Sequence, residues 1–159
     1  MYTLGFVKCD DTVLLLNRQK APHMGKWNGV GGKIDPEETP MECIVRETIE
    51  ETGLTIDNYA CRGRLRWFRD GNDLGFVWLF TGSMSAKEIK ESYPQGTREG
   101  ILDWKKMDWI IHKDNVGIVD NIKLLWQHMW NGKKEDIYIA EYSGNDLVKV
   151  YKDESETTR

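Results

Sequence analysis

The chain has 159 residues, of which 40% are apolar and 30% are charged. This length suits a single domain with a sizeable core. The net charge of −4 and the lack of a basic run argue against a surface for duplex nucleic acid. Because the sequence contains no signal peptide and no long apolar stretch, we expect neither secretion nor a membrane-spanning segment.

The three cysteines, Cys9, Cys43 and Cys61, are odd in number and widely spaced. They match neither a zinc-ligand pattern nor a disulfide framework. The simplest interpretation is three reduced thiols in a cytoplasmic protein. A reactive thiol at Cys43, close to the carboxylates described below, is the alternative.

The first predicted elements are two strands, at Tyr2–Lys8 and Thr12–Asn17, with Asp10-Asp11 in the turn between them. Residues 18–26 form a predicted loop that contains a proline and a glycine. The glycine-rich run at residues 29–32 follows and leads toward a helix.

The helix is predicted at Pro40–Thr52. Thr39 and Glu42 have the spacing of a capping box, and proline stands at the first helical position, where its missing N–H is not needed. Gly53 suits the left-handed residue that ends many helices.

The helix carries three glutamates on one face. At about 100° per residue, Glu47, Glu50 and Glu51 fall within an arc of about 100°. Two carboxylates about 4 Å apart repel by about 4 kcal/mol at an effective dielectric constant near 20, which a bound divalent cation would relieve. A solvated acidic helix is the alternative. The opposite, largely apolar face is predicted to pack, and it consists of Met41, Ile44, Val45, Thr48, Ile49 and Thr52.

The second half of the chain reads as strands, one helix and a hairpin. Strands are predicted at Leu54–Ile56, Tyr59–Arg69, Gly75–Thr81 and Ile101–Trp104, with a turn at residues 70–73 and a long loop at 84–100 that holds a helical turn near 86–90. A second helix is predicted at Val119–Trp130. A hairpin at Ile137–Tyr142 and Leu147–Tyr151 precedes a frayed tail at residues 153–159.

The segment Gly32–Leu54 resembles the Nudix box, the signature of Nudix hydrolases. Gly32 is followed after five residues by Glu38, after seven more by Arg46-Glu47, after two by Glu50-Glu51, and after one by Gly53-Leu54. Agreement at so many fixed positions argues against an ordinary acidic surface helix. One position departs, because Thr48 stands where the box has an aliphatic residue. We expect Thr48 to pack through its methyl group.

The resemblance implies Mg²⁺, with Mn²⁺ as a possible substitute, and cleavage of a nucleoside diphosphate linked to another group. The expected metal ligands are Glu47, Glu50, Glu51 and the carbonyl of Gly32. Oxygen ligands of this kind suit Mg²⁺, and a bound metal can activate water.

A distant loop glutamate serves as the base in some Nudix members, whereas a helix glutamate serves in others. Glu99 is the candidate for this distant carboxylate, as a metal or water ligand, and the identity of the base stays open between Glu99 and a helix glutamate. Arg46 is expected to orient the glutamates, and Glu38 to act structurally beside them.

The segment from Lys26 to Lys33 resembles the approach to the box in MutT-type enzymes, which hydrolyse oxidised purine nucleoside triphosphates such as 8-oxo-dGTP. Residues 2–4, 104–109 and Asp120 are similar to the mammalian branch of that group. The resemblance implies a small-molecule nucleotide substrate. Its expected contacts are Asn28 and Asp120 with the base edge, Thr3 on the pocket floor, Trp67 stacked on the purine, and Arg18 and Lys33 on phosphates.

Two departures bear on the base. The mammalian branch has adjacent aspartates where this chain has Asp120-Asn121, and the tryptophan before them is replaced within residues 117–119. The alternatives are therefore another Nudix substrate, namely a canonical dNTP, a nucleotide sugar or a dinucleoside polyphosphate, or a non-catalytic nucleotide sensor.

The mixture of strands with two helices predicts a layered α/β fold. The Nudix resemblance implies an α/β/α sandwich around a mixed central sheet, formed by one domain at residues 1–152. The oligomeric state, monomer or homodimer, is left open.

Overall fold

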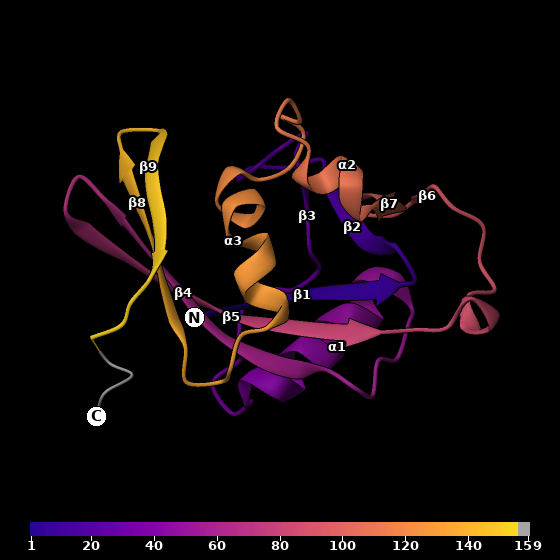
Figure 1. Ribbon diagram of the computed structural model, residues 1–159. Helices are drawn as coiled ribbons and strands as arrows, with labels where there is room; N and C mark the ends of the chain where they lie inside the picture. Colours follow the sequence, from indigo (N-terminus) through magenta and orange to yellow (C-terminus); the bar gives the residue numbers. More distant parts are fainter. Residues whose placement is uncertain (156–159) are drawn as a thin grey trace.

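A mixed sheet runs through the computed structural model, which describes residues 1–155 (Figure 1). Its order is β6-β7-β2-β1-β5-β4-β8-β9, and the short β3 pairs with β2. The pairs β1/β5 and β4/β8 are parallel, and the other pairs are antiparallel. In chain order the strands are β1 (Tyr2–Cys9), β2 (Thr12–Arg18), β3 (Trp27–Asn28), β4 (Ala60–Arg69), β5 (Asn72–Ser83), β6 (Gln95–Gly96), β7 (Gly100–Lys106), β8 (Ile137–Ser143) and β9 (Asp146–Lys152).

Two helices cover opposite faces of this sheet, α1 (Pro40–Thr52) and α3 (Asp120–Trp130), as Figure 1 shows. The alternation of side chains along β2 explains the two layers. Val13 and Leu15 pack in one core cluster with residues of α3, whereas Leu14 and Leu16 pack in a second cluster with Ile44 of α1. Burying each such side chain contributes about 1.5–3 kcal/mol. The predicted α/β/α sandwich is confirmed.

Helix α1 begins and ends where the sequence predicts. The Thr39 hydroxyl accepts from the N–H of Glu42, and the N–H of Thr39 donates to the Glu42 carboxylate, both at 3.1 Å. Gly53 ends the helix with a φ of 74°, a left-handed conformation that favours glycine. These local contacts set the helix in a fixed register and so fix the face on which its glutamates lie.

Some predicted elements were wrong. Leu54–Ile56 is not a strand; this segment leaves the end of α1, and Ile56 packs into the α1-side core. The turn after β4 is limited to Asp70-Gly71, both with positive φ, so β5 begins at Asn72 and not at Gly75. The 3₁₀ turn η1 (Ala86–Glu88) lies where a helical turn is expected, whereas β3, β6 and the short α2 (Met107–Ile111) were not predicted.

The start of the predicted tail is ordered. The N–H of Asp153 donates to the carbonyl of Ile137 at 2.7 Å, and its carboxylate accepts from Ser155. The rest of the tail, residues 156–159, lies outside the described residues. In the described part of the chain, no helix is both long and apolar enough to span a bilayer.

Candidate active site

The glycine-rich run lies directly against the acidic face of α1. A Cβ atom added to Gly32 would collide with the carboxylate of Glu47, so any other residue here would push that carboxylate away from the backbone. The neighbouring N–H of Gly31 donates to Oε2 of Glu51 at 3.3 Å. The backbone of residues 31–32 and two of the helix glutamates therefore form one wall.

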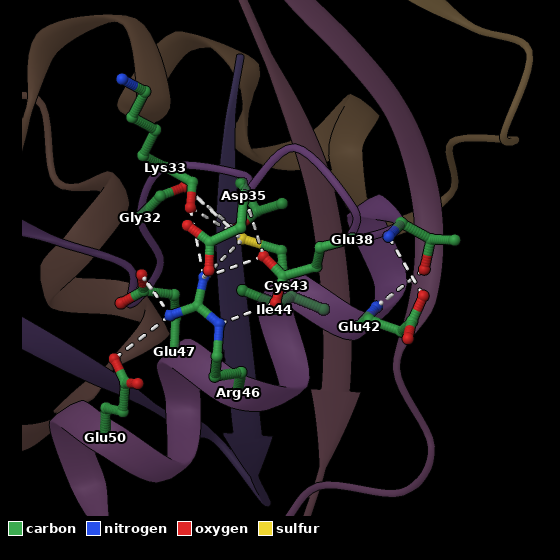
Figure 2. Close-up of polar contacts among 12 residues, drawn as sticks. Gly32, Lys33, Asp35, Glu38, Glu42, Cys43, Ile44, Arg46, Glu47 and Glu50 are labelled. Atoms are coloured by element: carbon green, nitrogen blue, oxygen red, sulfur yellow. Dashed lines mark hydrogen bonds and ion pairs between the residues drawn. The ribbon is translucent and has the colours of Figure 1, made fainter.

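Arg46 sits at the centre of the carboxylate cluster (Figure 2). Its guanidinium binds both carboxylate oxygens of Glu38, at 2.7 and 2.9 Å, and reaches Glu47 at 3.0 Å and Glu50 at 3.3 Å. Hydrogen bonds from Arg46 lower the pKa of Glu38 to about 2. Arg46 also donates to the backbone carbonyl of Lys33 at 3.2 Å, whereas the Lys33 side chain points away from it.

Burial makes two glutamates of α1, Glu47 and Glu51, harder to ionise. Burial raises the pKa of Glu51 to about 8, against the opposing hydrogen bond from Gly31, and the charges of Glu47 and Glu99 raise it further. Burial also raises the pKa of Glu47, which Arg46 partly offsets. The ionised forms of Glu47 and Glu51 are therefore destabilised unless a cation binds beside them.

The donor set fits a hard divalent cation, because it consists of carboxylate and carbonyl oxygens. Within residues 1–155, however, no three histidine, cysteine, aspartate or glutamate side chains already stand together as a metal cluster. The hydrogen bonds explain this, since Arg46 holds Glu47 and Glu50 while Gly31 holds Glu51. The carbonyl of Gly32 accepts from the N–H of Thr3 at 2.8 Å and, at the longer distance of 3.4 Å, from the Thr3 hydroxyl, so a metal ion would replace the weaker of these two bonds.

A cavity of about 1310 Å³ extends from this wall across the sheet. The structure brings most sequence-predicted site residues to its lining, whereas Arg46 and Lys33 do not line it. Those in the lining are Thr3, Arg18, Asn28, Gly32, Glu47, Glu50, Glu51, Trp67, Glu99 and Asp120.

Polar and aromatic side chains line the same cavity as the helix glutamates. Oδ1 of Asn28 accepts from the N–H of Gly29 at 2.8 Å, which leaves its NH₂ group without a partner among the described residues. Trp67 lies at a bulge of β4, and it also packs against the α3-side core. Thr3 is buried, and its hydroxyl lies 3.2 Å from Sγ of Cys43.

Other cavity residues were not predicted as site residues from the sequence. They are His23, Arg98, Tyr142 and Asn145, together with Asn121, which the sequence marked only as a departure from adjacent aspartates. Tyr142 and Asn145 come from the C-terminal hairpin, which the parallel pairing of β8 with β4 places beside the cavity. Such pairing between distant segments leaves no trace in local sequence.

Two buried side chains of α1, Thr48 and Cys43, resolve questions from the sequence. Thr48 is fully buried, and its hydroxyl is satisfied by the carbonyl of Ile44 at 2.6 Å and by the hydroxyl of Tyr59 at 2.8 Å. Thr48 therefore does more than pack through its methyl group. Burial raises the pKa of Cys43 to about 11, which keeps it a thiol and argues against the reactive alternative.

Comparison with known proteins places the chain in a family. The model of the NUDIX domain matches residues 2–115. The Danio rerio protein named oxidized purine nucleoside triphosphate hydrolase is 29% identical over 153 residues, which cover 96% of this chain and 92% of that protein. The Mus musculus protein of the same name is 40% identical over 118 residues, covering 72% of this chain and 70% of that one.

The fold agrees with this relationship. The crystal structure of the MutT protein from Bacillus halodurans matches with a TM-score of 0.72 and 27% identity, covering 96% of both chains. The chain therefore belongs to the Nudix family, and it is a hydrolase of that family.

Proposed function

We propose that this hydrolase converts oxidised purine nucleoside triphosphates, such as 8-oxo-dGTP, to the monophosphate and pyrophosphate with Mg²⁺, for which Mn²⁺ can substitute. The observation that carries the proposal is that one cavity joins the glutamates of α1 to Asn28, Trp67 and Asp120. The names of the Danio rerio and Mus musculus relatives point to the same substrate class. The biological role would be sanitation of the nucleotide pool in the cytoplasm.

The phosphate end of the cavity would hold the metal and the reacting phosphoryl group. Glu47, Glu50, Glu51, Glu99 and the carbonyl of Gly32 would hold Mg²⁺, which when bound neutralises phosphate charge and makes water a better nucleophile. Side chains orient the glutamates, bind the phosphates and accept the proton.

Arg46 orients Glu47 and Glu50 through its hydrogen bonds, while Arg18 in the cavity lining binds phosphate oxygens. Lys33 stays a predicted phosphate contact from outside that lining. A glutamate of α1 or Glu99 accepts the proton of the attacking water.

The base end would recognise the purine. The free NH₂ group of Asn28 donates to acceptors on the base, and the carboxylate of Asp120 accepts from its N–H groups. Trp67 stacks on the ring, and Thr3 forms part of the floor. Stacking and edge contacts together hold the nucleotide so that its phosphates reach α1.

A second candidate is a larger Nudix substrate, such as a nucleotide sugar or a dinucleoside polyphosphate. The size of the cavity favours it, because about 1310 Å³ exceeds the roughly 300–1,000 Å³ of most ligand pockets. A canonical dNTP would occupy the same site as its oxidised form. The hydrolase relationship and the complete set of box glutamates weigh against a non-catalytic sensor.

The test is a substrate screen with purified protein and Mg²⁺ or Mn²⁺. The panel contains 8-oxo-dGTP, dGTP, a nucleotide sugar and a dinucleoside polyphosphate, and it is repeated with EDTA and with Glu47→Gln. We expect the highest kcat/KM for 8-oxo-dGTP, with pyrophosphate released and activity lost in EDTA. Equal turnover of dGTP and 8-oxo-dGTP would contradict sanitation.

A further inference from the structure

Tyr142, on β8, reaches across to the first turn of α3. Its hydroxyl donates to Oδ1 of Asp120 at 2.8 Å, and it accepts from Nδ2 of Asn121 at 3.0 Å. The N–H of Asn121 also donates to Oδ1 of Asp120, at 2.7 Å. All three residues line the cavity.

The order of donors in this group is fixed by chemistry. An amide NH₂ group only donates, so the phenol oxygen accepts from Asn121 and turns its single proton toward Asp120. Burial and the bond to Asp120 raise the pKa of Tyr142, so its proton stays in place. Oδ1 of Asp120 therefore receives two donors, and Oδ2 has no partner in the described part of the chain.

We propose that Tyr142, held by Asn121, is a positioning residue that fixes Asp120 as a pure acceptor and thereby selects guanine-type over adenine-type oxidised nucleotides. This inference rests on the proposed function. A guanine edge presents two adjacent N–H donors, which suit a carboxylate. An adenine edge places the lone pair of N1 beside its amino group, so it offers one donor and one acceptor, and the acceptor N1 is mismatched against a carboxylate oxygen that can only accept.

Adjacent aspartates would not have this restriction, because two carboxyl groups can share a proton. In this chain an amide occupies the second position, and its NH₂ group is used to hold Tyr142. The Asp120-Asn121 pair is therefore part of a three-residue device whose third member lies on another strand.

The test compares Tyr142→Phe with Tyr151→Phe. The control removes the same hydroxyl from β9, where it binds Glu141 at 3.3 Å outside the cavity lining. Two quantities are measured: kcat and KM for 8-oxo-dGTP and 8-oxo-dATP, and, without metal, the Kd of the two corresponding monophosphates by calorimetry. The thermal melt of each variant checks that it is folded.

We expect the wild-type protein to prefer the guanine-type nucleotide by about tenfold or more in both measurements. Tyr142→Phe should reduce that preference by about fivefold, mainly through KM and with kcat little changed, because one hydrogen bond to a charged group is lost. Tyr151→Phe should keep it. Asn121→Asp should raise affinity for the adenine-type monophosphate, since a second carboxyl can share a proton.

Three results would overturn the inference: no preference in the wild type, an unchanged preference in folded Tyr142→Phe, or no binding of either monophosphate. The proposed function fails separately, if no purine triphosphate is hydrolysed. In that case the binding measurements with the monophosphates still decide the role of Tyr142.

Discussion

Replacing Glu51 with glutamine should stabilise the metal-free protein at alkaline pH. The pKa of Glu51 is raised from 4.5 to about 8, chiefly by burial. Below about pH 4.5 the group is protonated in both the folded and unfolded states. Between pH 4.5 and about 8 the unfolded chain releases the proton while the folded protein keeps it, so folding loses stability as pH rises, and above about pH 8 the loss is complete.

The size of this effect follows from the two pKa values. At about 1.4 kcal/mol per pH unit, the interval from 4.5 to about 8 corresponds to an upper limit of about 5 kcal/mol. A side chain that turns toward water recovers part of it, so we expect about 2–4 kcal/mol at pH 8.5. Glutamine removes the charge, while its carbonyl can still accept from the N–H of Gly31, which now donates to Glu51.

The measurement is urea unfolding in EDTA at pH 4.5 and pH 8.5. The matched control is Glu50→Gln, because the Glu50 side chain is 58% exposed and should change stability little. The free energy of unfolding of Glu51→Gln should exceed that of the wild type at pH 8.5, and this difference should be larger than at pH 4.5. The melting temperature of the variant at pH 8.5 should be roughly 5–15 °C above that of the wild type. A loss of stability at pH 8.5, or the same change in both variants, would refute the reasoning.

Three further predictions concern single residues. Glu47→Gln should lower kcat by about 100-fold or more with an unchanged circular dichroism spectrum, since it removes an expected metal ligand; full activity in this variant would move the metal site elsewhere. Asn28→Ala should reduce discrimination between purines more than it reduces triphosphate hydrolysis, and an equal loss for all triphosphates would show that Asn28 does not read the base. Thr48→Val should cost about 1–3 kcal/mol in urea unfolding, because it strips the buried hydroxyl of Tyr59 of its partner; a cost below about 0.5 kcal/mol would contradict that role.

The phosphate end of the site could be predicted because its chemistry is local. The contacts that begin and end α1 lie within four residues of each terminus, so the capping pattern at Thr39 and the glycine at position 53 determine its bounds. Once the helix is set, its period of about 3.6 residues puts the glutamates on one face. The same spacing put Arg46 within reach of Glu50, four residues on, but it did not show that Arg46 also binds Glu38.

The base end could be predicted only in part. Asn28 and Asp120 were predicted as base contacts from the family resemblance, and the structure places both in the cavity lining. Tyr142 was not predicted, because it reaches Asp120 only through the pairing of β8 with β4, which is set by tertiary packing. For the same reason the short strands β3 and β6 were missed, since two-residue segments are stabilised by their partners and carry no pattern of their own.

Two carboxylates of the cavity lining lie in different environments, Glu51 largely buried on α1 and Asp120 exposed on α3. At α1, the hydrogen bond from Gly31 is too weak to offset the effect of burial on the pKa of Glu51, so its ionised form needs a nearby cation. At α3, Asp120 stands in the first turn of the helix and receives the hydroxyl of Tyr142 and a backbone N–H, so its charge is satisfied by neutral donors. If the proposed function is correct, the α1 end of the cavity needs a cation before its glutamates can ionise, whereas the side-chain contacts at Asp120 form without one.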